Sequence, residues 1–273
     1  MKCFVCGAPT AFAFAKTYTE EPFATFMTDI GEVRYERCPD CGFTFSRTHA
    51  ELDAARWQQL NQDFHHHLED PDQERLNNQP PYAEQALMLA MLSRHGVVDM
   101  ADALDFAAGY GTLSRLLGEY FGIELPIHDP FISGSGTALH IQPGAGRTFN
   151  TVINSAMFEH VTCREDLDQV DRLVSSTGCL ILHTVVCERV PNDPDWFYIR
   201  IPVHTAFHTN GSMQRLMEQW GYRSSLYCPP SKCWVLFRDP PADTAARLAA
   251  LNRQLQAEWF IYKEGFVDYW KGF

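Results

Sequence analysis

The hydrophobic pattern after residue 81 alternates between two periods. Apolar residues at helical spacing predict helices, whereas short and nearly continuous apolar runs predict strands that are buried on both faces. Helices are expected over residues 82–94 and 212–220, and others begin near residues 112, 162 and 243. Strands are expected over residues 101–106, 123–129, 149–155 and 179–186, with an antiparallel pair at 222–227 and 232–238.

This alternation predicts a doubly wound α/β fold with a mostly parallel sheet. Parallel strands need crossover connections, and right-handed crossovers place helices on both faces of the sheet. The first helix would pack through Ala83, Ala86, Leu87, Ala90 and Met91, and the second through Leu113, Leu116, Leu117 and Tyr120. A Thr162–Glu165 capping box would open the next helix, whose inner face is Leu167, Val170 and Val174 and whose stop is Gly178.

Four regions are expected along the chain. Residues 1–47 contain paired cysteines and alternating aromatics, which predict a small β-rich module. Residues 48–81 form a helical linker or lid, residues 82–240 the main α/β domain, and residues 241–273 a helical extension at the carboxyl end.

Composition narrows the possible partners. With 273 residues and 45% hydrophobic content the chain can bury one large core and carry a small satellite module. A net charge of -12 disfavours nucleic acid, whose binding depends on clustered lysine and arginine, and favours a small-molecule or carrier-bound substrate. Without a membrane span or a leader segment, the sequence is interpreted as cytoplasmic, and it is compatible with a homodimer.

Two Cys-x-x-Cys-Gly knuckles lie in the amino-terminal module. Cys3, Cys6, Cys38 and Cys41 can place four thiolates at the corners of a tetrahedron, which is typical of a structural zinc site. Glycine after the second cysteine of each pair permits the turn that aims backbone N–H groups at sulfur. Because protein would fill all four positions, the zinc is expected to be structural; four unligated or redox thiols are the alternative.

A glycine-containing turn follows the strand at 101–106. Gly109 and Gly111 leave the backbone bare at the start of a helix, where free N–H donors and the lack of a Cβ favour a nucleotide-like ligand. Asp129 ends the next strand, about 20 residues on, where a carboxylate can accept both hydroxyls of a ribose. The alternative is an ordinary tight turn with a surface aspartate.

The segment Asp105-x-Ala107-x-Gly109-x-Gly111 resembles the glycine-rich signature of class I S-adenosylmethionine-dependent methyltransferases, with alanine in place of the first glycine. Residues 154–161 resemble the segment after that family's fourth strand, and residues 222–238 resemble its closing antiparallel hairpin. The resemblance covers residues 82–240 and implies a Rossmann-like, seven-stranded sheet. A zinc ribbon followed by such a domain also resembles natural-product and sugar-pathway methyltransferases.

The resemblance implies a role for each matching residue. Asp105, Ala107, Gly109 and Gly111 would line the methionine and ribose side of S-adenosylmethionine. Asp129 would hold the ribose hydroxyls, and Phe131 would pack on the adenine or serve as a core aromatic. Asn154 and Ser155 would lie beside the cofactor near its sulfonium, with Glu159 and His160 behind them.

Methyl transfer to a hydroxyl or an activated carbon benefits from a base that removes the acceptor's proton. The resemblance favours His204, followed by His208 and His160; hydrogen bonds from these imidazoles to loop backbone are the alternative reading. The run His65–His67 suggests a metal cluster, but consecutive helical residues point about 100° apart and cannot converge on one ion.

The expected activity is therefore in-line transfer of the methyl group of S-adenosylmethionine to carbon or oxygen of an acceptor. Two other functions stay open. The cofactor could instead undergo cyclisation of its aminocarboxypropyl chain, or the chain could be a binding module in which the ribbon docks a partner and the α/β domain is a scaffold.

Overall fold

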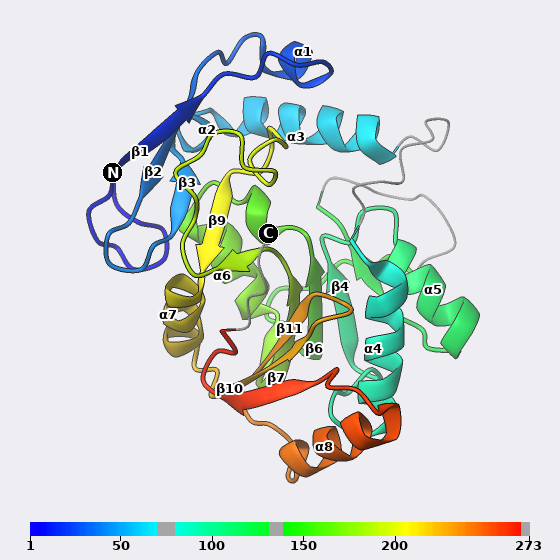
Figure 1. The fold of residues 1–273 in the computed structure, drawn as a ribbon. Coiled ribbons are helices and arrows are strands. Elements are labelled where there is room, and N and C mark those ends of the chain that lie inside the picture. The colour runs from blue at the N-terminus through cyan, green and yellow to red at the C-terminus, as the bar shows by residue number, and fades with distance from the viewer. Residues whose placement is uncertain (70–79, 131–138, 269–273) are drawn as a thin grey trace. The chain divides into compact units, whose positions relative to one another are not determined.

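The computed structural model of the chain describes residues 1–69, 80–130 and 139–268. Its contacts divide the chain into two compact units, each assembled from three segments (Figure 1). The first unit contains the described parts of Met1–Gln79 together with Phe158–Asp166 and Val185–Arg215; the second contains those of Pro80–Met157, Leu167–Thr184 and Leu216–Phe273. The four-region division of the sequence remains a prediction.

The second unit is built on a seven-stranded sheet in the order β12-β10-β11-β7-β6-β4-β5. Strands β7, β6, β4 and β5 are parallel to one another, and β11, β10 and β12 are joined to them by antiparallel pairings. The bounds are β4 Ala103–Phe106, β5 Ile127–His128, β6 Phe149–Ser155, β7 Val174–His183, β10 Ser224–Cys228, β11 Cys233–Phe237 and β12 Ile261–Glu264. The predicted α/β class with a seven-stranded sheet is confirmed.

Helices cover the sheet on both faces. Three of them, α4 (Tyr82–Arg94), α5 (Thr112–Phe121) and α8 (Thr244–Leu255), share one hydrophobic core with alternate strand residues such as Ile181 and Val235. Leu180 and Leu182 point to the opposite face and are also fully buried. The ends of α6 (Arg164–Arg172) and α7 (Asn210–Trp220) that belong to this unit are joined by a hydrogen bond from Trp220 Nε1 to Asp168 Oδ1.

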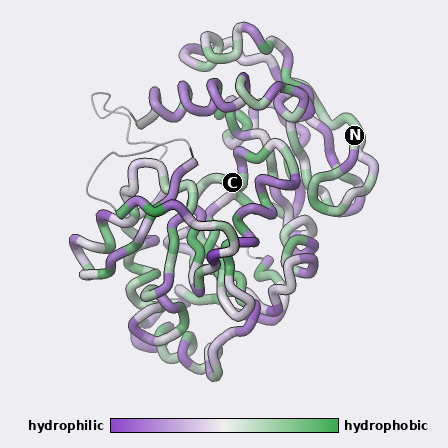
Figure 2. Tube along the Cα trace, turned by 180° about the vertical axis from the view of Figure 1, so that it is seen from behind, coloured by the Kyte–Doolittle hydropathy of each residue, from purple (hydrophilic) through white to green (hydrophobic). Residues whose placement is uncertain are grey.

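The first unit is built on a five-stranded sheet in the order β1-β2-β3-β9-β8. Its bounds are β1 Ala11–Lys16, β2 Val33–Arg37, β3 Thr44–Ser46, β9 Ala206–Thr209 and β8 Val186–Cys187. Thus two strands from the last third of the chain, β8 and β9, complete the amino-terminal sheet. The short helices are α1 Phe23–Met27, α2 Arg47–Ala50 and the 3-10 turn η2 Phe158–His160, and the longer α3 Ala54–Glu69 is largely hydrophilic along its trace (Figure 2).

Several elements match their predicted bounds. The helix at 82–94 and the strand at 149–155 have the predicted ends, and the 222–238 pair forms an antiparallel hairpin. The strand expected at 123–129 contains only Ile127 and His128, and β12 was not predicted. Since β12 lies within the predicted helical extension and pairs with β10, it supplies an edge of the seven-stranded sheet.

The predicted capping box and the helix after it are displaced. Asp166, rather than Glu165, accepts the backbone N–H groups of Thr162 and Cys163, because the helix begins at Arg164. Val174 opens β7 instead of ending the helix, and Val186 lies in β8 of the other sheet. Gly178 stands inside β7, where a Cβ would lie 2.7 Å from Asn150 O. It permits close backbone approach and is not a helix stop.

Two packing stripes also differ from their predictions. Tyr120 is exposed on α5, with 67% of its surface accessible, although Leu113 and Leu117 are buried as expected. On α4 the buried residues are Gln85, Ala86, Met88, Leu89 and Leu92. The stripe predicted for α4 shares only Ala86 with this set, so the inner face of that helix is rotated from its expected position.

Within the described ranges, none of the helices combines the length and the apolar character needed to cross a membrane.

Substitution by alanine should have opposite effects on stability at two glycines of the second unit. Gly178→Ala should lower the free energy of unfolding by about 1–3 kcal/mol, because the new Cβ meets backbone oxygen. Gly118→Ala should raise it by about 1 kcal/mol, because Gly118 lies inside α5 with no atom within 4 Å of a Cβ. Urea unfolding monitored by circular dichroism measures both values, and equal shifts would contradict the close approach at Gly178.

Candidate functional site

The turn between β4 and α5 has an alternating left-handed backbone. Ala107, Gly109 and Gly111 have φ angles of 58°, 56° and 74°, at every second position. Glycine adopts this conformation without a steric cost, whereas an alanine is strained there by about 1–2 kcal/mol. The turn therefore requires glycine, or a residue under strain, at the three positions that the sequence motif singled out.

Asp129, directly after β5, holds this turn. Its Oδ2 accepts the backbone N–H of Gly109 at 2.9 Å, and Ala107 N donates to His128 O at 2.8 Å. A carboxylate thus faces the glycine turn from the neighbouring strand, as the sequence predicted. Because α5 begins at Thr112, the first N–H groups of that helix lie next to the same turn.

Buried polar atoms gather at the carboxyl ends of β4 and β6. Within the described residues, Asp105 Oδ1, Asn154 Oδ1 and Gln85 Nε2 have no hydrogen-bond partner. Asn154 Nδ2 donates to Phe106 O at 2.9 Å, and Ser155 Oγ donates to Gln85 Oε1 at 3.1 Å, which ties α4 to the end of β6. Each unsatisfied buried group costs about 1–3 kcal/mol, a cost that a polar ligand can remove.

Burial also alters the charge of Asp105. Desolvation, followed by repulsion from the negative charge of Asp129, raises the pKa of the Asp105 carboxyl to about 8. The carboxyl is therefore largely protonated at neutral pH. Two unpaired acceptors and one unpaired donor fit a ligand that carries both an ammonium and a carboxylate, which are the two charged groups of a free amino acid.

Sequence reasoning missed Gln85, because the inner face of its helix was assigned to other positions. The signal was a single glutamine in a helix otherwise rich in alanine, leucine and methionine. Phe131, the predicted adenine neighbour, lies outside the described residues.

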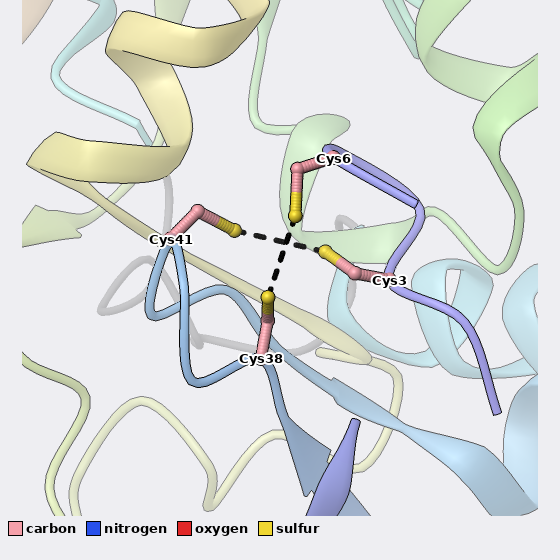
Figure 3. A group of neighbouring side chains, drawn as sticks. All are labelled: Cys3, Cys6, Cys38 and Cys41. Carbon is pink, nitrogen blue, oxygen red and sulfur yellow. Dashed lines mark hydrogen bonds between the residues drawn. The ribbon is translucent and has the colours of Figure 1, made fainter. Parts of the chain in front are cut away.

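The four predicted zinc ligands come together in the first unit. Cys3 Sγ lies 3.7 Å from Cys41 Sγ, and Cys6 Sγ lies 3.4 Å from Cys38 Sγ (Figure 3). Four sulfurs bound to zinc at about 2.3 Å would be separated by about 3.8 Å, close to these distances. All four sulfurs also lie within 4.8 Å of one another, so the cluster fits a tetrahedral ion.

The glycine that follows each Cys-x-x-Cys pair has a left-handed backbone. Gly7 and Gly42 have φ angles of 75° and 76°. Their N–H groups donate to the carbonyl oxygens of Cys3 and Cys38, each at 3.0 Å. Gly42 is also packed, because a Cβ there would lie 3.0 Å from Thr209 Cγ2.

The three predicted histidine bases occupy two environments in the first unit. His160 and His204 are neighbours, with ring centroids 5.0 Å apart, and each forms an Nδ1 hydrogen bond with a backbone carbonyl. Burial lowers the pKa of His204 to about 3 and that of His160 well below its usual value. His208 lies apart, fully buried against Phe43 and Phe158, with its Nε2 bonded to Phe158 O.

The histidine run on α3 does not converge on one point, as the helical geometry predicted. The ring of His65 contacts that of His160, whereas the ring of His67 packs against Phe26. The ring of His65 thus contacts His160, which is distant in sequence.

No family model matches the sequence, and no curated protein matches it. Among solved structures, the chain is similar to the plantazolicin methyltransferase BpumL in complex with a monoazolic desmethylPZN analog and SAH, with a TM-score of 0.43, 11% identity, and coverage of 67% of this chain and 96% of that chain. It is also similar to an O-methyltransferase family protein from Burkholderia thailandensis, with a TM-score of 0.42, 13% identity, and coverage of 70% of this chain and 61% of that chain. A third similar structure is magnesium protoporphyrin IX methyltransferase from Synechocystis PCC 6803 with bound SAH, with a TM-score of 0.41, 12% identity, and coverage of 67% of this chain and 95% of that chain. Likenesses of this strength do not assign this chain to a family.

The cysteine cluster should bind zinc through all four thiolates. Cys38→Ser should lower the zinc content by about one equivalent per chain and destabilise the first unit, since metal binding supplies folding free energy. Cys163→Ser, at an exposed cysteine outside the cluster, should keep the native zinc content. Elemental analysis after gel filtration measures both, and native zinc in Cys38→Ser would contradict the site.

Proposed function

We propose that the chain transfers the methyl group of S-adenosylmethionine to carbon or oxygen of a small-molecule or carrier-bound acceptor. The observation that carries this proposal is the left-handed turn of Ala107, Gly109 and Gly111 facing the Asp129 carboxylate. A bare backbone turn, a helix start and an acidic residue on the next strand suit an adenosyl group at the carboxyl edge of a parallel sheet.

In this proposal the residues of the second unit hold the two ends of the cofactor. Asp129 would accept the ribose hydroxyls, and Gly109 and Gly111 would let the ligand approach the backbone. The unpaired Asp105 Oδ1 would accept the ammonium of the methionine moiety, and Gln85 Nε2 would donate to its carboxylate. Asn154 and Ser155 would lie toward the sulfonium, and Phe131 would pack on the adenine.

When bound, S-adenosylmethionine supplies an electrophilic methyl group, and the chain's task is to hold the acceptor atom in line with it. His204 is the first choice for the base that takes the acceptor's proton, followed by His160. His208 is less suited, because it is fully buried and its Nε2 is bonded to backbone. The His204 imidazole is neutral, which is the form that accepts a proton, but burial lowers its pKa to about 3 and so makes it a weak base.

A cytoplasmic location and a homodimer belong to the same proposal. Free thiols are typical of a reducing compartment, and all nine cysteines, each within the described ranges, are unbridged.

Gly109→Val should weaken S-adenosylhomocysteine binding by about 100-fold or more, because a branched side chain would fill the turn and strain its backbone. Gly221→Val is the matched control, since Gly221 also has a positive φ, of 78°, but follows α7 with open space around it. Isothermal titration calorimetry measures both affinities. Unchanged affinity in Gly109→Val, with native binding in the control, would refute the placement of the cofactor.

The cofactor product separates methyl transfer from the other chemistry. Native protein purified without added ligand should release S-adenosylmethionine or S-adenosylhomocysteine on denaturation, as identified by mass spectrometry. Turnover of added S-adenosylmethionine should yield S-adenosylhomocysteine. Methylthioadenosine as the product would contradict methylation.

Binding should also depend on pH through Asp105. Its raised pKa means that the free protein holds a proton on this carboxyl below about pH 8. An ammonium ligand favours the ionised carboxylate, so binding near neutral pH should release a proton, and affinity should rise with pH by up to about tenfold per unit.

Calorimetry of S-adenosylhomocysteine in buffers with different ionisation enthalpies measures this proton release. Asp105→Asn cannot ionise and should lose both the pH slope and the buffer dependence. The same slope in native protein and in the variant would show that another group releases the proton.

A further inference from the structure

Glu159, His160 and His204 form a second cluster of metal-ligating side chains, separate from the four cysteines. One ligand atom from each residue lies within 4.8 Å of the others. All three belong to the first unit, and they come from two segments that are distant in sequence, η2 and the loop before β9. Two imidazoles and one carboxylate are a donor set that divalent transition metal ions prefer.

Hydrogen bonds orient both imidazoles as metal ligands. His160 Nδ1 lies 3.0 Å from Val203 O, and His204 Nδ1 lies 2.8 Å from Tyr198 O. A carbonyl oxygen only accepts, so both Nδ1 atoms carry the proton and each Nε2 keeps its lone pair. Metal-binding histidines usually donate their other ring N–H to a carbonyl or a carboxylate in this way.

The carboxylate is fixed by its own partners. Tyr198 Oη donates to Glu159 Oε1 at 2.7 Å, and the backbone carbonyl of Glu159 accepts from Thr205 N at 2.7 Å, which fixes the main chain that carries it. Glu159 is buried, with 3% of its surface exposed, and a buried carboxylate gains strongly from a nearby cation. Tyr198 therefore holds both sides of the cluster, because its hydroxyl contacts Glu159 and its carbonyl contacts His204.

A third imidazole stands next to the cluster. The ring of His65 lies 4.9 Å from that of His160, between centroids. The Nδ1 hydrogen bonds of His160 and His204 to carbonyl oxygens fit the neutral imidazole, which is the state in which a histidine binds metal.

We propose that Glu159, His160 and His204 bind one divalent transition metal ion of the zinc, iron(II) or cobalt(II) type. Three protein ligands leave at least one coordination position for water or substrate, unlike the closed cysteine site. Binding of the ion does not depend on methyl transfer. Its chemical use does rest on the proposed function: an ion there would polarise an acceptor oxygen, and His160 and His204 would act as ligands instead of bases.

Cobalt(II) distinguishes the two sites, because thiolate ligands give an intense sulfur-to-metal charge-transfer absorption that nitrogen and oxygen ligands lack. Native full-length protein, cleared of metal and titrated with cobalt(II), should bind about two equivalents per chain. One should show the thiolate absorption and the other only weak d–d bands.

The His160→Gln/His204→Gln double variant and Glu159→Gln, which keeps the size of the side chain, should each lose the second equivalent and keep the thiolate-bound ion. His183→Gln is the matched control, because His183 also bonds a backbone carbonyl through Nδ1 but lies outside the cluster. It should bind both equivalents.

Native protein that binds cobalt(II) and zinc(II) at about one equivalent per chain, with thiolate bands only, would overturn the proposal whether or not the variants fold. A second equivalent that persists in both cluster variants would overturn it as well. Neither readout involves S-adenosylmethionine, so failure of the metal site and failure of the proposed function are separate results.

Discussion

The constraint on which the second unit's candidate site depends is the left-handed backbone between β4 and α5. Three residues at alternate positions, Ala107, Gly109 and Gly111, adopt positive φ angles, and the N–H of the middle residue donates to Asp129. At these three alternate positions the side chain is a methyl group or absent, and a carboxylate is fixed beside the turn. The parallel pairing of β4 with β5 brings Asp129 to the turn, so the site is a consequence of the sheet's register.

Sequence motifs predicted those parts of the structure that depend on residues close together in the chain. The glycine spacing predicted the left-handed turn, and the two Cys-x-x-Cys-Gly motifs predicted the sulfur cluster. Both the turn and the cluster depend on the conformations of a few neighbouring backbone residues. The strand at 149–155 was predicted with its observed bounds. Gln85 could not be found this way, because its burial depends on how α4 rotates against the sheet.

The remaining differences arise from pairings between distant segments. Residues of β8 and β9 join the amino-terminal strands, and the edge strand β12 pairs with β10. Neither pairing has a local signature, since β8 contains two residues and β12 carries a polar, half-exposed pattern. The histidine cluster has the same origin: only the folded first unit brings His160 and His204 together. The two candidate metal sites of the first unit differ in chemistry. One is closed and made of four thiolates, and the other is open and made of imidazole and carboxylate.

The central claim, that an adenosyl ligand occupies the turn after β4, is tested most directly by hydrogen–deuterium exchange of the native protein with and without S-adenosylhomocysteine. With the ligand bound, exchange should be slower in peptides that contain residues 107–114 and Asp129, and unchanged in peptides that contain the four zinc-site cysteines. Unchanged exchange over residues 107–114 at saturating ligand would contradict it.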